Sequence, residues 1–368
     1  MRIVTIKDVA RRAGVGVSTV SRVFNDHPDV SAETKEKVLR IAKRLHYRPH
    51  SRARQLVTAT TETICFVLSN RAVMSPFHSH VLIGVEEHAR SLSRNVLFMR
   101  FDYSADVAPD DLELPGVIWE RGTVDGVILA GTNYPNFVSA VRNLRLPFVL
   151  MGNNLVGELP GKDISTVWFD SESGTRLVVE YLIGLGHREI WFVADLGPPW
   201  YRVSFESYAA TMRHHGLTPN RLEMPPPAGR LLDYGTACAE QLLETCPQAT
   251  AVMAGDDEIA LGVLSGFQRR GIAVPEDISL VGFDDIDEIK YLHPPLTTVR
   301  VPKEGVGEHL AQSLFDLINK EQTGPVKRVL PTELVIRSSC AAPRRRDQIR
   351  TVVDSIQGNP RTRATDEA

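Results

Sequence analysis

A short stretch near the amino terminus carries side chains that can hydrogen-bond to the edges of nucleic-acid bases. The stretch GVGVSTVSRVFND has one arginine among small hydroxyl and apolar residues. Arg22 can offer a bidentate fork to guanine, Ser18 can bond to several bases, and Val17 can contact a thymine methyl group. Thr19 and Ser21 are better placed for phosphates, which fix register without reading sequence. The alternative is that Arg22 is only a solvated surface charge.

Three helices are expected to position these side chains. Thr5 can cap a helix with Asp8 at its third position, and Gly14 stops that helix. A second helix runs from about Val17 to Asn25, and a third follows the N-cap Ser31. Two short helices with a glycine-containing turn, braced by a third, form a helix-turn-helix whose second helix enters the DNA major groove. The predicted buried face consists of Val20, Val23, Phe24, Val38, Ile41, Ala42 and Leu45.

The charge distribution supports a polyanionic partner for this region. Residues 1–60 contain 13 Lys and Arg against 5 Asp and Glu, a net charge of +8, whereas the whole chain has −3 and the remainder therefore −11. A basic amino-terminal region on an acidic body indicates that only the former meets nucleic acid.

Other signals narrow the class of protein. The start MRIVTIKDVA lacks a secretory apolar stretch, and no run approaches the ~18 apolar residues of a membrane span, so we expect a cytoplasmic protein. The four cysteines form no CxxC, which predicts buried thiols and no zinc site or disulfide framework. The motifs GxxxxGK[ST], HExxH and GxSxG are absent, so we expect no enzyme, cofactor or metal.

The amino-terminal segments TIKDVARRAGV, STVSRVFN, VSAETKEKVLRIAKRLHYRP and ARQL resemble the lactose-repressor (LacI/GalR) family of transcription regulators. The resemblance implies a helix-turn-helix domain over 1–49 and a hinge helix over 50–61, which by composition alone reads as a linker. The hinge would fold in the minor groove of an operator bound by a dimer, with Leu56 wedged between base steps. Gly16 stands where the family usually has serine, which removes one hydroxyl contact. The candidate DNA-binding residues are Thr5, Val17, Ser18, Thr19, Ser21, Arg22, Asn25, Ser31, Tyr47, Arg52, Ala53, Arg54 and Leu56.

The body alternates short apolar runs such as VDGVILAG and EIWFVAD with amphipathic stretches such as SGTRLVVEYLIGLG. This pattern predicts parallel sheets covered on both faces, the doubly wound α/β class. The resemblance, carried by GDDEIALGVLSGFQRRGIAVPEDISLVGFDDID and HPPLTTVRVP, implies an effector-binding and dimerisation domain over 62–340, with two periplasmic-binding-protein-like lobes. The lobes would comprise about 62–165 with 295–325, and 166–294 with 326–340. Residues 341–368 are expected to be a disordered tail.

Ligands of such sheets lie beyond the carboxyl ends of the strands, so the cleft between the lobes is the expected site. By similarity, Asp170, Asp256 and Asp284 would bond effector hydroxyls, with Phe77 against an apolar face, although Phe77 can equally be core. Acceptor-rich sites suit a sugar, polyol or nucleoside. Asp257 and Asp285 are interpreted as helix caps. The candidate effector-binding residues are Asn70, Phe77, Thr132, Asp170, Arg202, Ser204, Asp256 and Asp284.

Two departures from the family concern this cleft. Family members usually have an arginine four residues before the aromatic residue that here is Tyr208, and Ser204 stands there instead. Asp256 replaces a common asparagine. A cleft with three aspartates and no arginine would prefer a neutral polyol or a cation to an anion, which is a hypothesis.

Three functions follow from the residues. The first is a dimeric repressor that binds a pseudo-palindromic operator and responds to a small sugar-like effector. The second is a DNA-binding regulator whose body responds to a protein partner or to no ligand. The third is a solute-binding or catalytic α/β protein with an incidental basic region, which is disfavoured because the capping, groove-facing and hinge features agree with one another.

Overall fold

The computed structural model describes residues 4–24, 27–47, 60–71, 73–222, 224–225, 229–321 and 324–344. Within these ranges, every helix is too short or too polar to span a bilayer. The predicted hinge residues Arg52, Ala53, Arg54 and Leu56, together with Asn25, lie outside them.

The amino-terminal domain contains the three predicted helices, α1 (Ile6–Ala13), α2 (Val17–Phe24) and α3 (Ala32–Arg44). The Asp8 carboxylate accepts from the Thr5 backbone N–H at 3.0 Å and from its hydroxyl at 2.8 Å, which fixes the start of α1. Gly14 ends α1 with φ 69°, a conformation that favours glycine. Ser31 caps α3 by accepting from the Thr34 N–H at 3.3 Å. The helix predictions are therefore confirmed.

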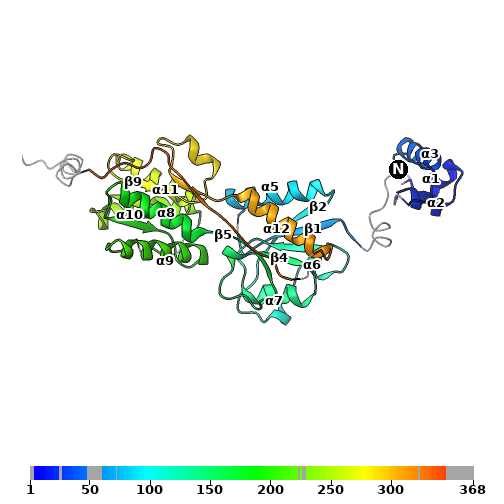
Figure 1. Ribbon diagram of the computed structural model, residues 1–368, viewed down its shortest axis with the longest axis horizontal. Helices are drawn as coiled ribbons and strands as arrows, with labels where there is room; N and C mark the ends of the chain where they lie inside the picture. The colour runs from blue at the N-terminus through cyan, green and yellow to red at the C-terminus, as the bar shows by residue number, and fades with distance from the viewer. Residues whose placement is uncertain are drawn as a thin grey trace, which may run out of the picture. The chain divides into compact units, whose positions relative to one another are not determined.

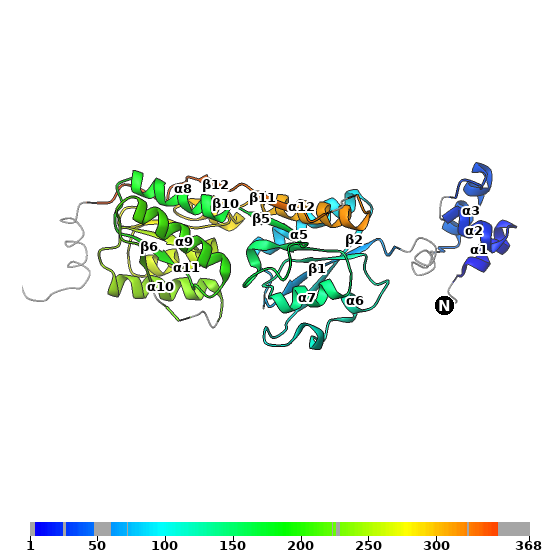
Figure 2. The ribbon, with the colours of Figure 1, turned by 60° about the horizontal axis from the view of Figure 1, so that its bottom comes forward.

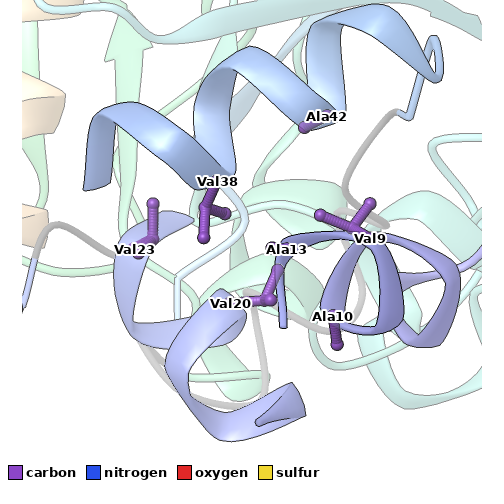
Figure 3. Close-up of a cluster of buried hydrophobic side chains, with 7 residues drawn as sticks. All are labelled: Val9, Ala10, Ala13, Val20, Val23, Val38 and Ala42. Carbon is purple, nitrogen blue, oxygen red and sulfur yellow. The ribbon is translucent and has the colours of Figure 1, made fainter. Parts of the chain in front are cut away.

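A small apolar core holds these helices together. Figure 3 shows its side chains, which come from all three helices and gather between them. Val9, Val20 and Val38 are completely buried, and Phe24 and Tyr47 pack at the edge with their rings 5.5 Å apart. Val20 and Val23 of α2 belong to this core, so the face of α2 that carries them is turned inward. The opposite face of α2 is free to meet a partner. The core consists of Val9, Ala10, Ala13, Val20, Val23, Val38 and Ala42.

The first lobe of the body is built on a six-stranded sheet (Figure 1). Neighbouring strands β3 and β4, β4 and β5, and β5 and β11 are parallel. Helices α5 (Pro76–Ser91) and α12 (Lys303–Ile318) lie side by side on one face, and α7 (Pro135–Asn143) lies on the other. In spatial order the strands are β11 (Lys327–Leu330), β5 (Ser165–Phe169), β4 (Phe148–Met151), β3 (Gly126–Leu129), β1 (Thr63–Ser69) and β2 (Asn95–Phe101).

The second lobe has a four-stranded parallel sheet in the order β7-β6-β8-β9. From β6 the chain first moves to β7 on one side and then returns to β8 and β9 on the other side. Because these crossovers are right-handed, α9 lies on one face of the sheet and α10 and α11 lie on the other. Figure 2 shows this arrangement, with α8 beside α9. The strands are β6 (Ile190–Val193), β7 (Asn220–Arg221), β8 (Ala251–Ala254) and β9 (Ser279–Val281). The helices are α8 (Ser171–Gly184), α9 (Pro199–His214), α10 (Leu231–Thr245) and α11 (Asp257–Arg269).

The remaining elements are short. Strands β10 (Thr298–Arg300) and β12 (Glu333–Val335) form an antiparallel pair, where two of the segments that connect the lobes run together. The others are the helix α6 (Gly116–Trp119) and the 3₁₀ turns η1 (Pro109–Asp111), η2 (Gly152–Asn154) and η3 (Asp287–Tyr291).

The doubly wound, two-lobed class was predicted correctly, but the chain leaves the first sheet later than expected. The boundaries near 165 and 325 fall before β5 and β11, yet both strands belong to the six-stranded sheet. Pairing of Arg328 with Val167 keeps the two strands together, so the chain crosses after Phe169 and after Leu330. The periodicity of an apolar run does not reveal which sheet it joins.

The ordered chain also extends past the predicted start of the tail at 341. The Ala341 carbonyl accepts from His187 and Ser279, and Arg344 pairs with Asp277 at 2.9 Å. Residues 341–344 are therefore anchored on the second lobe, because a buried histidine and serine need that carbonyl as a partner. The rest of the predicted tail lies outside the described residues.

Each lobe contains a helix pair that packs through glycines. A Cβ on Gly84 of α5 would lie 2.0 Å from the Glu304 carbonyl oxygen of α12, and one on Gly307 would lie 2.0 Å from the Val81 carbonyl oxygen. In the second lobe, a Cβ on Gly262 of α11 would lie 2.1 Å from the Leu232 carbonyl oxygen of α10. Real side chains do not fit at such distances, so these helices approach each other backbone to backbone.

We predict that Gly262→Ala destabilises the protein by about 1–3 kcal/mol, since the added methyl group forces α10 and α11 apart. Gly184→Ala, at the end of α8, is the matched control because its Cβ would meet no atom within 4 Å. It should be neutral or stabilise by up to about 1 kcal/mol through helix propensity. Urea unfolding at one pH measures both, and equal effects of the two changes would contradict close helix packing.

Candidate functional site

The outer face of α2 presents the residues predicted to read DNA. Val17 is 42% exposed, Ser18 and Arg22 are exposed, and Thr19 and Ser21 are half-buried on its flanks. The exposed face is narrow and carries no side chain larger than Arg22, so an approach to base edges in a groove is sterically open.

Three other candidate DNA-contacting residues make contacts that stabilise this domain itself. Thr5 and Ser31 cap α1 and α3, and both are exposed. Tyr47 packs on Phe24 and is half-buried, so burial raises the pKa of its hydroxyl. Their hydroxyl groups lie at two helix N-termini and at the edge of the domain, and their contact with DNA stays a prediction.

A cavity lies between the two lobes at the carboxyl ends of the strands. The first lobe contributes Arg71, Phe77 and His78, and α9 of the second contributes Trp200 and Tyr201. Rings of Phe77 and Phe169 lie 5.7 Å apart and give the first-lobe side an apolar surface. The other lining residues are Ser75, Asn154, Ser171, Ser204, Leu231, Gly255, Asp256, Glu258, Phe283, Asp284 and Ile286.

Asp256 follows β8 after one glycine, Gly255, and caps α11. Its Oδ1 accepts from the Ile259 N–H at 2.7 Å, and its Oδ2 accepts from the Tyr201 hydroxyl. Burial raises the pKa of Asp256, although both hydrogen bonds oppose this shift. A backbone N–H and a phenol hydroxyl thus orient the carboxyl group of Asp256, which lines the cavity.

Asp284 follows β9 in a backbone conformation that L-residues rarely adopt, with φ 112°. Two contacts hold it there. Its N–H donates to the Val299 carbonyl at 2.8 Å, and its own carbonyl accepts from Lys303 Nζ at 2.6 Å. Burial, reinforced by Asp256 and Asp257, raises the pKa of Asp284 well above its usual range. Lys303 begins α12 of the first lobe, so this contact also links the lobes.

His78 is buried and neutral, and it lines the first-lobe side of the cavity. Its Nε2 lies 3.1 Å from the Ala130 carbonyl, so Nε2–H donates and Nδ1 accepts from the Ser75 hydroxyl at 2.8 Å. Burial lowers the pKa of His78 well below its usual value, and the charge of Arg71 adds to the effect. Asn154 donates to the same carbonyl at 2.8 Å and lines the same side of the cavity.

Arg71 is the charged residue of the cavity that differs most from the expectation. Its guanidinium carbon lies 4.3 Å from the centroid of the Trp200 ring, across the cavity. The expectation of a cleft without an arginine is therefore wrong, because the cation comes from the turn after β1 and not from α9. The available signals were an arginine directly after the strand-end Asn70 and an aromatic pair following Pro199 at a helix start.

Four of the predicted effector-binding residues line the cavity, namely Phe77, Ser204, Asp256 and Asp284. The other four do not. Asn70 accepts from the Tyr103 N–H at 2.9 Å, and the Thr132 carbonyl accepts from Ser69. Asp170 caps α8 by accepting from the Ser173 N–H at 2.9 Å. Arg202 is exposed and donates to the carbonyls of Leu196 and Gly197.

The interpretation of Asp257 and Asp285 as helix caps is wrong. Asp256 takes the N-cap position of α11, so Asp257 points into the interior, where it accepts from Thr298 at 2.7 Å and from the Ile286 N–H at 2.9 Å. Asp285 instead pairs with Arg300, at 2.7 Å, and with Arg337. Both carboxylates brace the connections between the lobes.

Comparison with known proteins gives the family. Residues 5–50 match "Bacterial regulatory proteins, lacI family", and residues 179–340 match "Periplasmic binding protein-like domain". The HTH-type transcriptional regulator MalR of Clostridium butyricum is 35% identical over 91% of this chain and 98% of its own length. The chain belongs to the LacI family.

Solved structures agree with this assignment of a LacI-family DNA-binding transcriptional regulator. The lac repressor dimer bound to operator and the anti-inducer ONPF is 26% identical with a TM-score of 0.78, covering 93% of this chain and all of that chain. A complex of the transcriptional regulator CelR with cellobiose is 29% identical with a TM-score of 0.66, covering 91% of this chain and 99% of that chain.

Burial raises the pKa of Asp257 to about 8. Between the ordinary carboxyl pKa and this value, the folded regulator holds a proton that the unfolded chain releases, so its free energy of unfolding should fall as pH rises. We predict that Asp257→Asn removes this slope, which for one group is at most about 1.4 kcal/mol per pH unit. Urea unfolding from pH 5 to pH 8 measures it.

Asp285→Asn is the control for that experiment. Burial favours a higher pKa for Asp285, but hydrogen bonds from Arg337 and Arg300 outweigh burial and lower this pKa. The stability that Asp285 contributes is therefore present above the ordinary carboxyl pKa and is lost only in acid. This variant should be less stable at every pH from 5 to 8, with the slope of the wild-type protein. An unchanged slope in Asp257→Asn would contradict the assignment.

Proposed function

We propose that this chain is a repressor that binds a pseudo-palindromic DNA operator as a homodimer and changes its DNA affinity when a small polyhydroxylated ligand occupies the interlobe cavity. Residues 1–49 form the DNA-binding domain, 50–61 the hinge, and 62–344 the ligand-binding and dimerisation domain. The protein acts in the cytoplasm, and the proposal assigns it no catalytic activity, since the matched relatives are named as regulators.

The exposed face of α2 supports the DNA-binding part of the proposal. Arg22 is the one long cationic side chain on that face, and its fork geometry suits guanine in the major groove. A single helix of eight residues offers too few base contacts for an operator. Two copies about one helical turn apart supply the missing specificity, which favours a dimer.

The cavity supports the ligand-binding part, and its two-lobed lining is the observation that carries it. Asp256, Asp284 and Ser204 offer oxygen acceptors, Arg71 offers donors, and Phe77 offers an apolar ring. Hydroxyl groups of a sugar satisfy acceptors and donors together, while the C–H face of its ring packs on an aromatic side chain. The CelR complex with cellobiose shows that a relative with this fold binds a sugar.

The test of the function combines DNA binding with a ligand screen. Affinity for operators selected from random duplexes should fall steeply with salt, because the basic domain displaces counterions. Neutral sugars, beginning with cellobiose and other mono- and disaccharides, should change that affinity. Operator binding that no sugar or nucleoside alters would support a regulator without a small ligand, and no preference among duplexes would refute the function.

We predict that Arg22→Ala lowers operator affinity by about 1–3 kcal/mol per half-site and relaxes the base preference at one position in each half-site. Arg11→Ala is the matched control, since Arg11 carries the same charge on α1 and pairs with Asp8 at 2.9 Å. It should weaken binding to all duplexes alike. Selection of duplexes by each variant measures the preference, and an unchanged preference in Arg22→Ala would contradict its role.

A further inference from the structure

Arg71 is placed in the cavity by the first lobe and held there by the second. It follows Asn70 at the end of β1, and its guanidinium stacks on Trp200 of α9 at 4.3 Å. A cation on an indole face within about 6 Å gains a favourable electrostatic contact, which is strongest when water is excluded. This contact therefore spans the cleft.

One hydrogen-bond donor of Arg71 has no partner in the part of the chain that the structure describes. Its Nε is buried and has no hydrogen-bond partner. A buried guanidinium N–H without a partner is costly, so it indicates a site for an acceptor that the protein does not supply. Trp200 covers one face of the group and leaves the in-plane donors available.

The charges around Arg71 restrict the acceptor. Asp256, Asp284 and Glu258 line the same cavity and attract the guanidinium. Within the described residues, no group donates a hydrogen bond to the Asp284 carboxylate. Three acidic groups thus face one guanidinium, and burial raises the pKa of all three, so the cavity disfavours the further negative charge of a ligand carboxylate or phosphate. A hydroxyl or ring oxygen can accept from Arg71 without that penalty.

We propose that Arg71 determines effector specificity. It donates to an oxygen of a neutral sugar or polyol, while a carboxyl oxygen of Asp284 accepts from a neighbouring hydroxyl. One side chain, Arg71, then both selects the ligand and joins the lobes around it. This inference rests on the proposed function. The arginine of the cleft then comes from the first lobe and not from position 204 of α9, and a sugar acid should bind more weakly than the neutral sugar with the same ring.

Isothermal titration calorimetry of the full-length protein tests the proposal with paired probes, D-glucose with D-glucuronate and D-galactose with D-galacturonate, together with cellobiose. The wild-type protein should bind at least one neutral probe, and should bind the paired acid at least about tenfold more weakly. Arg71→Ala should weaken binding of the neutral probe by about 10- to 100-fold, the range expected for hydrogen bonds from a charged donor. Arg71→Lys, which keeps the charge but loses the fork, should restore only part of the loss.

Arg202→Ala is the matched control, because Arg202 lies on the same helix as Trp200 but donates to the carbonyls of Leu196 and Gly197 outside the cavity. It should bind the probes like the wild-type protein, and thermal unfolding without ligand confirms that each variant is folded. Equal affinity of wild type and Arg71→Ala for a neutral probe, or a wild-type preference for the acids, would overturn the role of Arg71 alone. A wild-type protein that binds none of the probes, and whose operator affinity no sugar or nucleoside changes, would overturn the proposed function and this inference with it.

Discussion

The cavity depends on a set of buried polar contacts that hold the chain where it leaves the second sheet. Lys303, only 5% exposed, donates to the carbonyls of Asp284 and Asp285, and the Asp257 carboxylate accepts from the Ile286 N–H. Buried polar groups are stable only when hydrogen-bonded partners surround them, so removal of one partner destabilises the others. These contacts hold Asp284 in a backbone conformation with φ 112°, beside the cavity that its side chain lines.

These contacts also make the connection between lobes specific. Lys303 lies on α12 of the first lobe, but its ammonium group donates to the carbonyls of Asp284 and Asp285 in the second lobe. A rotation of one lobe against the other therefore changes these hydrogen bonds. Backbone-to-backbone packing at Gly84 and Gly262 keeps each lobe rigid behind this junction. A rigid lobe transmits a change at the cavity over its whole length, whereas a loosely packed one would absorb it.

Half of the ligand-binding residues predicted from the sequence line the cavity, and the reason that the other half do not is geometric. Parallel strands end at one edge of a sheet, so Asp256 and Asp284 could be placed near each other from their positions after apolar runs. At the end of a strand, the conformation of the following loop decides which side chain points toward the cleft. Asn70 turns away to bond Tyr103, and the next residue, Arg71, enters the cavity. The residues around the strand end do not show which of the two side chains enters the cavity, because that depends on the fold of the turn.

By itself, the sequence determined the helix-turn-helix and the alternation of strands and helices, because caps, periodicity and turn residues act over a few positions. It also determined the charge contrast between the amino-terminal domain and the body, which is a sum over residues. Only the tertiary structure decided that β5 and β11 share a sheet and that Arg71 meets Trp200. These are contacts between segments more than a hundred residues apart, which packing and burial select and no local pattern encodes.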